Sequence, residues 1–360
     1  MASFDVVIPC YNYGHFLGRC VGSVLRQQGV DVRVLVIDDA STDDSASVGR
    51  ALAAADPRVE FRVHEKNAGH IATYNEGLLG WARADYCLLI SADDFVAPGA
   101  FARAAALMDA QPQIAFVYGM AQVFTDDDEP QESAHRAPTD QVVLPGPEFL
   151  ESVCELGNLV STPAAIVRTS MQHKVGGYRP ELPHTGDMEM WMRLAAHGSV
   201  GIIRGVQAYY RVHANNMSSA YYGRRMRDID EQVHAYEAIV GHFAGAIPEL
   251  RAWSARAYRR IAVAAVTLAG DAFEEGDDAA AQHCVDLARR LWPGVAATRE
   301  WRKFRVKKLL GRGLMRTVRP VMQKLGVLKG VDTRAAGSLY ILRGKELGWW
   351  PAQAGPRAGA

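Results

Sequence analysis

The feature that most restricts the fold is an alternation of short apolar runs and longer helical patterns over residues 1–120. The apolar runs are rich in Val and Ile and predict buried strands, while the segments between them have the apolar spacing of helices. Strands separated by helices of about 10–15 residues indicate βαβ units and a mostly parallel sheet. The predicted strands are Phe4–Pro9, Val32–Asp38, Val59–Val63, Tyr86–Ile90 and Ile114–Tyr118, and the predicted helices are Phe16–Gln27, Asp44–Ala55, Ile71–Ala82 and Pro98–Met108.

The pattern changes twice further along the chain. Residues 125–147 carry an acidic run and four prolines, which predicts a surface loop. A strand at Thr162–Arg168, a helix at Asp187–His197 and an extended segment at Val200–Val212 are expected next, and after about residue 222 the pattern is helical. We therefore expect a sheet-containing domain over residues 1–221, a helical appendage over 222–296, and a basic segment with a flexible tail over 297–360.

Composition is that of an ordinary globular protein, with 49% hydrophobic and 22% charged residues and no formal net charge. This balance gives no reason to expect a nucleic-acid partner. The five cysteines are scattered without a C-x-x-C pair, which argues against a disulfide framework or a zinc site and favours a reducing compartment. Neither a signal peptide nor a membrane-spanning apolar stretch is visible, so we expect a cytoplasmic protein.

Polar motifs follow three of the predicted strands, at the carboxyl ends where ligands bind in open parallel sheets. They are Pro9–Asn12, the pair Asp38 and Asp39, and the pair Asp93 and Asp94. Either pair alone could be a turn or a helix cap, since Asp favours both. Two pairs at adjacent strand ends repel each other unless a positive group lies between them. A divalent cation bound to a diphosphate would supply that charge, because Mg²⁺ uses one or two carboxylates beside phosphates.

Two later positions are further candidates for chemistry. Asp187 opens the predicted helix G-D-M-E-M-W-M-R-L and could be a plain helix cap. A carboxylate at a helix N-terminus is also held ionised and oriented, as a general base must be. His213 closes the last extended segment, and it would serve a metal or phosphate only if the chain returns to the same cleft.

Taken in order, these motifs resemble the family 2 inverting glycosyltransferases, which have the GT-A fold. The resemblance runs from about Phe4 to Ser218. It implies an α/β fold with a mostly parallel central sheet flanked by helices, here followed by a C-terminal helical appendage. It also implies transfer of a single sugar, with inversion, in bacterial cell-surface polysaccharide or glycoconjugate synthesis. The matching motifs are V-V-I-P-C-Y-N, V-I-D-D-A-S-T-D, N-A-G-H-I-A-T-Y-N-E-G, L-I-S-A-D-D, G-G-Y, G-D-M-E-M-W-M-R-L and Y-R-V-H-A-N-N-M-S.

The resemblance assigns the nucleotide-sugar donor to the first two motifs. Asp38 and Asp39 would contact the nucleoside, and the backbone from Pro9 to Tyr11 would line the base and ribose. UDP is the commonest nucleotide of the family, with dTDP and GDP as alternatives. The acceptor would be a hydroxyl of a saccharide or of a lipid-linked molecule.

The later motifs would carry the metal and the catalytic base. By resemblance, Asp93 and Asp94 would bind Mn²⁺ or Mg²⁺ together with the diphosphate, with His213 beside them, and Asp187 would be the catalytic base. The metal would stabilise charge on the leaving diphosphate while Asp187 takes the acceptor's proton. A single displacement of this kind inverts the anomeric carbon.

Two positions depart from the family's usual motifs. Ser91 stands where the metal motif commonly begins with Asp, which leaves open whether Asp93 or Asp94 binds the ion directly. Tyr74 stands where Arg is often found, which removes one phosphate contact. Two alternatives remain: a non-catalytic nucleotide-sugar-binding scaffold, and a sugar-phosphate nucleotidylyltransferase, whose Gly-rich basic loop is missing from Pro9–Gly14. The Q-x-x-R-W signature of processive members is absent, which favours single-sugar addition.

A basic segment lies near the C-terminus, with ten Lys or Arg and no Asp or Glu from Arg302 to Lys329. Such an amphipathic helix can lie on the anionic inner face of a membrane. Alternatively, its apolar stripe packs against the rest of the protein, and Gly311, Gly313 and Pro320 interrupt a continuous helix. The apolar residues near helical spacing are Leu310, Leu314, Val318, Val321 and Leu325.

Overall fold

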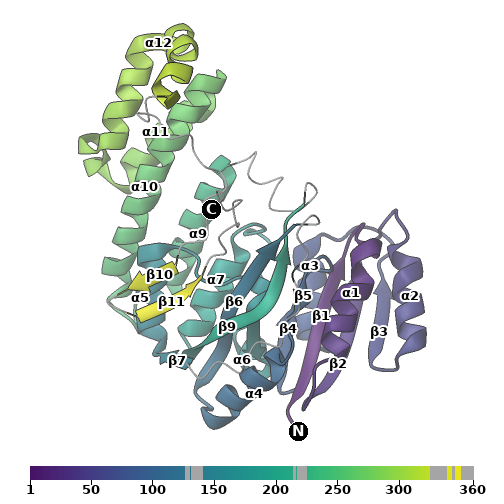
Figure 1. The fold of residues 1–360 in the computed structure, drawn as a ribbon. Helices are drawn as coiled ribbons and strands as arrows, with labels where there is room; N and C mark the ends of the chain where they lie inside the picture. Colours follow the sequence, from purple (N-terminus) through teal and green to yellow (C-terminus); the bar gives the residue numbers. More distant parts are fainter. Residues whose placement is uncertain are drawn as a thin grey trace, which may run out of the picture. The chain divides into compact units, whose positions relative to one another are not determined.

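The computed structural model describes residues 1–125, 130, 141–213, 216, 225–324, 339–342 and 345–349. The chain forms two compact units. The first comprises Met1–Val153, Asn158–Ala214 and Ala336–Ala360, and the second comprises Cys154–Gly157 and Asn215–Ala335. The first unit is built on a β-sheet and the second is helical (Figure 1).

A nine-stranded sheet forms the centre of the first unit, in the order β3-β2-β1-β4-β8-β6-β9-β5 with β7 beside β9. Its first half, from β3 to β4, is parallel as predicted. Its second half is mixed, because β8 pairs antiparallel with both β4 and β6 while β9 runs parallel to β6. The strands are β1 (Ser3–Cys10), β2 (Asp31–Asp38), β3 (Val59–Val63), β4 (Tyr86–Leu89), β5 (Phe95–Val96), β6 (Ile114–Phe124), β7 (Gln141–Leu144), β8 (Ala165–Arg168) and β9 (Ser199–Arg211).

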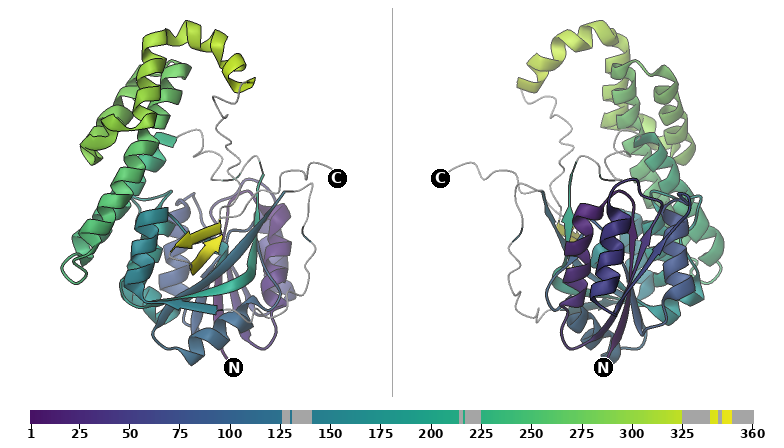
Figure 2. Two further views of the ribbon diagram at one scale, coloured as in Figure 1. Left: turned by 60° about the vertical axis from the view of Figure 1, so that its left-hand side comes forward. Right: turned by 90° about the vertical axis from the view of Figure 1, so that its right-hand side faces the viewer.

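Helices cover both faces of this sheet (Figure 2). They are α1 (Gly14–Leu25), α2 (Ser45–Ala55), α3 (His70–Asn75), a π-helix (Glu76–Trp81), α4 (Ala100–Ala110), α5 (Gly146–Leu156), α6 (Thr169–Val175) and α7 (Gly186–Ala195).

The central strand β1 is buried on both faces, which explains its continuous apolar sequence. Val6 and Ile8 belong to a core cluster with residues of α1 and α4. Val7 points the other way, towards the π-helix, where a Cβ on Gly77 would lie 2.3 Å from a Val7 methyl carbon. The glycine therefore allows the π-helix to approach the sheet closely.

The structure corrects the expectation of a loop over residues 125–147. Gln141–Leu144 forms the edge strand β7, which pairs with β9, and α5 begins at Gly146. The apolar run of this edge strand, Val142–Leu144, has only three residues, which is too short to predict a strand. A Cβ at Gly146 would lie 1.8 Å from the carbonyl oxygen of Ala195, so a glycine is needed for the close approach. The acidic run at residues 126–129 lies outside the described residues.

The second unit contains α9 (Arg225–Phe243), α10 (Leu250–Glu275), α11 (Asp278–Leu291) and α12 (Arg299–Lys324). Gly276, with φ of 95°, ends α10, and the Asp277 side chain caps α11 by accepting from the Ala280 amide at 2.9 Å. Gly311 is non-helical, with φ of 71°, so α12 bends part-way along its length (Figure 2). Within the described ranges, no helix combines the length and apolar character that crossing a bilayer requires.

Two short strands follow where a flexible tail was expected. They are β10 (Leu339–Leu342) and β11 (Lys345–Trp349), which pair antiparallel in a sheet of their own. The apolar run Leu339–Leu342 is only four residues long and lies near a Gly-, Pro- and Ala-rich end of the sequence, so the pattern predicts no structure there.

Candidate active site

The polar loop after β1 is hydrogen-bonded to the polar loop after β2. The Asn12 amide donates to Ser41 Oγ at 2.8 Å, and Asn12 Oδ1 accepts from the Thr42 amide at 2.8 Å. Both loops turn through the left-handed region, at Asn12 with φ of 58° and at Ala40 with φ of 60°. Asn adopts this region at low cost, whereas Ala does not. The bonds hold the end of β1, including the exposed Tyr11 ring, beside the end of β2.

Asp38 and Asp39 are both buried, but their carboxylates have different surroundings. Asp38 Oδ1 accepts from the Ser41 amide at 3.1 Å, while Oδ2 is buried without a hydrogen-bond partner among the described residues. Asp39 accepts from the amides of Ala68 and Gly69, at 2.7 and 2.9 Å. Asp39 therefore shapes the loop before α3, and Asp38 keeps an acceptor oxygen for another group.

His64 joins Asp39 to a second carboxylate. Its Nδ1 lies 2.7 Å from Asp39 Oδ1, and its Nε2 lies 2.9 Å from Glu76 Oε2. Burial alone would lower the pKa of His64, but the hydrogen bonds to Asp39 and Glu76 outweigh it and raise this pKa above its ordinary value. A protonated His64 thus links the β2 end to the start of the π-helix.

The two carboxylates of the second acidic pair, Asp93 and Asp94, also have different contacts. Asp93 Oδ2 lies 3.1 Å from His213 Nε2. Asp94 Oδ1 instead accepts from the Arg211 amide at 2.9 Å, and Arg211 Nε donates to the Asp93 carbonyl at 3.1 Å. Burial and the neighbouring Asp93 charge raise the pKa of Asp94 well above its ordinary value. Asp94 fastens the loop to β9, while the Asp93 carboxylate faces His213.

Aromatic rings surround the His213 imidazole. The rings of Tyr13 and Phe16 lie 5.4 and 5.2 Å from it, centroid to centroid. Burial, followed by the charges of Asp93 and Asp94, raises the pKa of the Tyr13 hydroxyl. The end of β9 thus places His213 beside Asp93 in the loop after β4, as its candidate role requires.

Asp93 and His213 together fit a divalent cation. They offer a carboxylate oxygen and an imidazole nitrogen close together, a donor combination that Mn²⁺ accepts. In the part of the chain that is described, no cluster of three or more His, Cys, Asp or Glu is placed to hold an ion. Two protein ligands are typical of a cation that takes its remaining ligands from a bound diphosphate and water.

Asp187 lies in the first turn of α7, two residues after Thr185 at the N-cap position. Its Oδ2 accepts from Asn158 Nδ2 at 2.9 Å, and its Oδ1 accepts from the Met188 amide at 2.6 Å. The helix N-terminus favours the ionised carboxylate. The two bonds hold the Asp187 carboxylate in one orientation, and Asp187 is not the cap residue itself.

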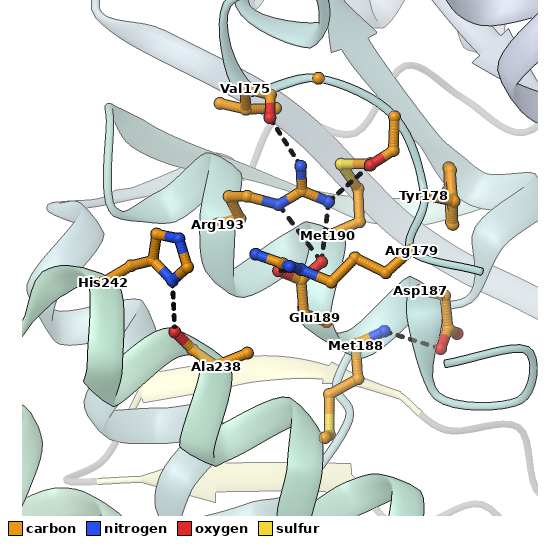
Figure 3. A network of polar contacts seen from close by, with 12 residues as sticks. Val175, Tyr178, Arg179, Asp187, Met188, Glu189, Met190, Arg193, Ala238 and His242 are labelled. Atoms are coloured by element: carbon orange, nitrogen blue, oxygen red, sulfur yellow. Dashed lines mark hydrogen bonds and ion pairs between the residues drawn. The ribbon is translucent and has the colours of Figure 1, made fainter. Parts of the chain in front are cut away.

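A buried ion network fixes α7 (Figure 3). Glu189 is fully buried and pairs with Arg179 at 2.9 Å and with Arg193 at 2.8 Å. Arg193 also donates to the carbonyl oxygens of Val175 and Gly177, at 2.6 and 2.8 Å. These bonds tie the helix that carries Asp187 to the G-G-Y segment.

The same segment is fastened to α3. Asn75 accepts from the Tyr178 amide at 2.7 Å and donates to the Tyr178 carbonyl at 2.8 Å, and His70 Nε2 lies 2.8 Å from the Pro183 carbonyl. A Cβ on Gly177 would lie 2.3 Å from Asn75 Oδ1, so only glycine fits beside this amide. The chain that precedes α7 is thus held in place by His70 and Asn75 of α3.

These contacts gather the candidate residues at one edge of the sheet. The parallel strands β1, β2 and β4 end there, and β8, antiparallel to β4, begins there. The 3-10 turn Thr162–Ala164 before β8 packs against β4 and β5. Asn158, just before this turn, therefore brings the Asp187 carboxylate to the edge that carries Asp93.

Residues 5–164 match the sequence model of glycosyl transferase family 2. They form a family 2 glycosyltransferase domain. Among curated proteins, chondroitin synthase of Pasteurella multocida is 34% identical over 96 residues, which is 27% of this chain and 10% of the synthase. The match therefore covers a small part of that much longer enzyme.

The glycosyltransferase has the GT-A fold, as the sequence predicts. Staphylococcus aureus TarS in complex with UDP-GlcNAc is 16% identical with a TM-score of 0.52, over 82% of this chain and 92% of TarS. Mannosyltransferase PcManGT from Pyrobaculum calidifontis, in complex with GDP-Man and Mn²⁺, is 14% identical with a TM-score of 0.50, over 91% and 88% of the two chains. The family model over residues 5–164 and the GT-A fold together support a glycosyltransferase of family 2.

Sequence reasoning missed three residues that support the site of this glycosyltransferase. Asn158, His64 and Asn75 each contact a residue far along the chain, at separations of 29, 25 and 103 positions. Asn75 stands within a motif that matches the family, so the resemblance could have indicated it. Neither Asn158 nor His64 carries a local signal, because an isolated Asn or His has many structural roles.

Proposed function

We propose that this glycosyltransferase moves one sugar from a nucleotide diphosphate sugar to an acceptor hydroxyl, with inversion and with the help of a divalent cation. The observation that carries the proposal is the contact between Asp93 and His213 at 3.1 Å, at the sheet edge where Asp187 is also held. TarS, which binds UDP-GlcNAc in its crystal structure, supports UDP as the nucleotide. The similarity to chondroitin synthase supports an acceptor in polysaccharide or glycoconjugate synthesis, as a saccharide or a lipid-linked sugar.

The nucleoside would bind between the ends of β1 and β2. The exposed Tyr11 ring offers a face for the base, beside the backbone of Pro9. Asp38 Oδ2 is the acceptor that an N–H of the base or a ribose hydroxyl would satisfy. Asp39 contributes indirectly, by holding the loop at Ala68 and Gly69.

The diphosphate would bind beside Asp93 and His213. These two side chains would hold Mn²⁺ or Mg²⁺, and Asp94 would keep Asp93 in position through its bond to β9. When bound, the cation would neutralise charge that develops on the leaving diphosphate. PcManGT, whose structure contains Mn²⁺ and GDP-Man, supports this assignment.

Asp187 would be the general base. The acceptor oxygen attacks the anomeric carbon from the face opposite the diphosphate, forming one C–O bond as the bond to the phosphate oxygen breaks. The hydroxyl proton passes to Asp187, and the electron pair of the broken bond leaves with the nucleotide diphosphate. The bond from Asn158 restrains the rotation of the Asp187 carboxylate, so that it would be oriented before the acceptor binds.

The substitution Asp187→Asn tests this assignment. The amide keeps the size of the carboxylate but cannot accept the proton, so we expect turnover to fall about 10²–10⁴-fold. The affinity for UDP, measured by calorimetry with Mn²⁺, should change less than about threefold. A matched control is Asp43→Asn, on the β2 loop away from the acceptor. An Asp187→Asn variant that keeps more than about a tenth of the turnover would show that another group is the base.

A further inference from the structure

The outer face of α12 carries an exposed apolar patch. Among the described residues, seven large hydrophobic side chains are exposed, and four of them lie on this one helix. Val306, Leu309, Leu310 and Leu314 are 52%, 81%, 41% and 48% exposed. The first three follow the spacing of one helix face. We call these four residues the α12 patch.

The opposite face of α12 is already packed within its own unit. Trp301 and Phe304 are buried. Lys307 pairs with Glu274 of α10 at 2.6 Å, and Arg312 donates to the Phe273 carbonyl at 2.8 Å. The helix is therefore held by a separate set of side chains, and the α12 patch does not contribute to that packing.

The packing within this unit bears on one of the two expectations for the apolar stripe. Leu310 and Leu314 are exposed in the structure and are not buried against their own unit. The side chains of Val318 and Val321, and the whole of Leu325, lie outside the described residues. The bend at Gly311 shortens the straight part of the helix to its first three turns.

Cations surround the α12 patch. Arg302, Lys303, Arg305 and Lys308 are exposed, and none forms an ion pair with a described residue. The sequence has no Asp or Glu from Arg302 to Lys329 that could neutralise them. An apolar centre with an unbalanced positive rim is complementary to the headgroup region of an anionic bilayer, where Leu enters the acyl boundary and Lys and Arg meet phosphates.

We propose that the α12 patch docks the enzyme onto an anionic membrane surface, with Leu309 and Leu310 inserted and the four cations at the headgroups. The helix lies in the interface and does not cross it. This docking is independent of the sugar-transfer chemistry, because no residue of the α12 patch belongs to the candidate active site.

Flotation of the full-length protein with vesicles tests the proposal. The vesicles are phosphatidylcholine, with or without phosphatidylglycerol, at low and high salt. We expect binding only to the anionic vesicles, weakened by salt, with about a fivefold loss in partition coefficient for each cation replaced by Gln. Leu309→Ser should lose about tenfold through its inserted side chain. The cation variant replaces Arg302, Lys303, Arg305 and Lys308, and a charge-matched control replaces the exposed Arg50, Lys174, Arg251 and Arg290.

The outcomes separate docking from the alternatives. Equal binding of the cation variant and its charge-matched control would reduce the effect to net charge and overturn the proposal. If Leu309→Ser left vesicle binding unchanged, the proposed insertion of Leu309 into the membrane would be wrong. Sedimentation without lipid shows whether a second copy covers the α12 patch, and a dimer that Leu309→Ser converts to monomer would replace the membrane with a protein partner. Sugar transfer to a soluble acceptor should be unaffected by these variants, so failure here is distinct from failure of the proposed activity.

Discussion

Replacement of His64 by Gln tests whether its hydrogen bonds to Asp39 and Glu76 stabilise the loop before α3, which contains Ala68 and Gly69. Glutamine keeps a polar side chain of similar length but cannot carry a charge between two carboxylates. The Ala68 and Gly69 amides, which bind Asp39, report directly on the loop. We therefore expect faster hydrogen–deuterium exchange in the peptide covering residues 64–72, measured by mass spectrometry.

The size of the effect follows from the geometry of the bridge. His64 Nδ1 lies 2.7 Å from Asp39 Oδ1, and the two side chains are 18% and 6% exposed. Unit charges about 4 Å apart attract by ~4 kcal/mol at an effective dielectric constant of about 20. Desolvation of the pair offsets roughly half of this. The remaining ~2 kcal/mol corresponds to an exchange rate about 30-fold faster in the variant.

The effect of His64→Gln on the exchange rate should depend on pH, because only a protonated His64 carries the charge. The pKa of His64 is raised in the folded protein above its ordinary value of 6.5. The protonated bridge therefore stabilises the loop fully below about pH 6.5, and this contribution is lost as pH rises through the raised pKa. The ratio of exchange rates between variant and wild type should be largest near pH 6 and fall to roughly threefold at pH 9, where a neutral hydrogen bond remains.

The control is His242→Gln, because His242 is exposed and bonds only to the backbone of its own helix at Ala238 in the described structure. It should leave exchange in residues 64–72 unchanged. A His64→Gln ratio that is the same at pH 6 and pH 9 would refute a charged bridge. An unchanged exchange rate at both pH values would refute any role of His64 in holding the loop.

Two further predictions concern the strand ends. Asp93→Asn should weaken Mn²⁺-dependent UDP binding at least about tenfold in calorimetry, on the scale of lost metal-site contacts. Asp94→Asn should change it less than about threefold, because an amide oxygen still accepts from the Arg211 amide; equal losses would contradict the division of tasks. Ala40→Gly should raise the midpoint of thermal unfolding by about 1–2 °C, since Gly relieves left-handed strain of ~1 kcal/mol and its own flexibility offsets about half. A lower midpoint would show that Ala40 is not strained.

The parallel half of the sheet was predictable because three of its strands, β1, β2 and β4, are largely buried on both faces. Continuous apolar runs such as Val32–Asp38 result from that burial, and the motifs at their ends follow directly in sequence. The edge strand β7 carries an apolar run of only three residues, Val142–Leu144, which does not distinguish a strand from a loop. The mixed half of the sheet was also not evident, since the direction of β8 depends on its long-range pairing with β4 and β6.

The sequence indicates candidate site residues by type and place, but it does not show that the two members of each acidic pair have different contacts. Each acidic pair looks symmetrical in the sequence. In the structure, Asp39 is engaged by two backbone amides and His64, and Asp94 by the Arg211 amide. Those partners lie 25 to 117 residues away, so no local pattern reveals them.

The division follows from the hydrogen bonds of each pair. Asp39 and Asp94 accept from backbone amides, and these donors offset part of the cost of burying a carboxylate. Those donors belong to the Gly69 loop and to β9, the segments that carry the other halves of the site. One carboxylate of each pair therefore connects the loops, and under the proposed function its neighbour, Asp38 or Asp93, would contact the ligand. Substituting one carboxylate at a time separates these two roles. Substituting both carboxylates of a pair would disrupt the loop and abolish binding at the same time.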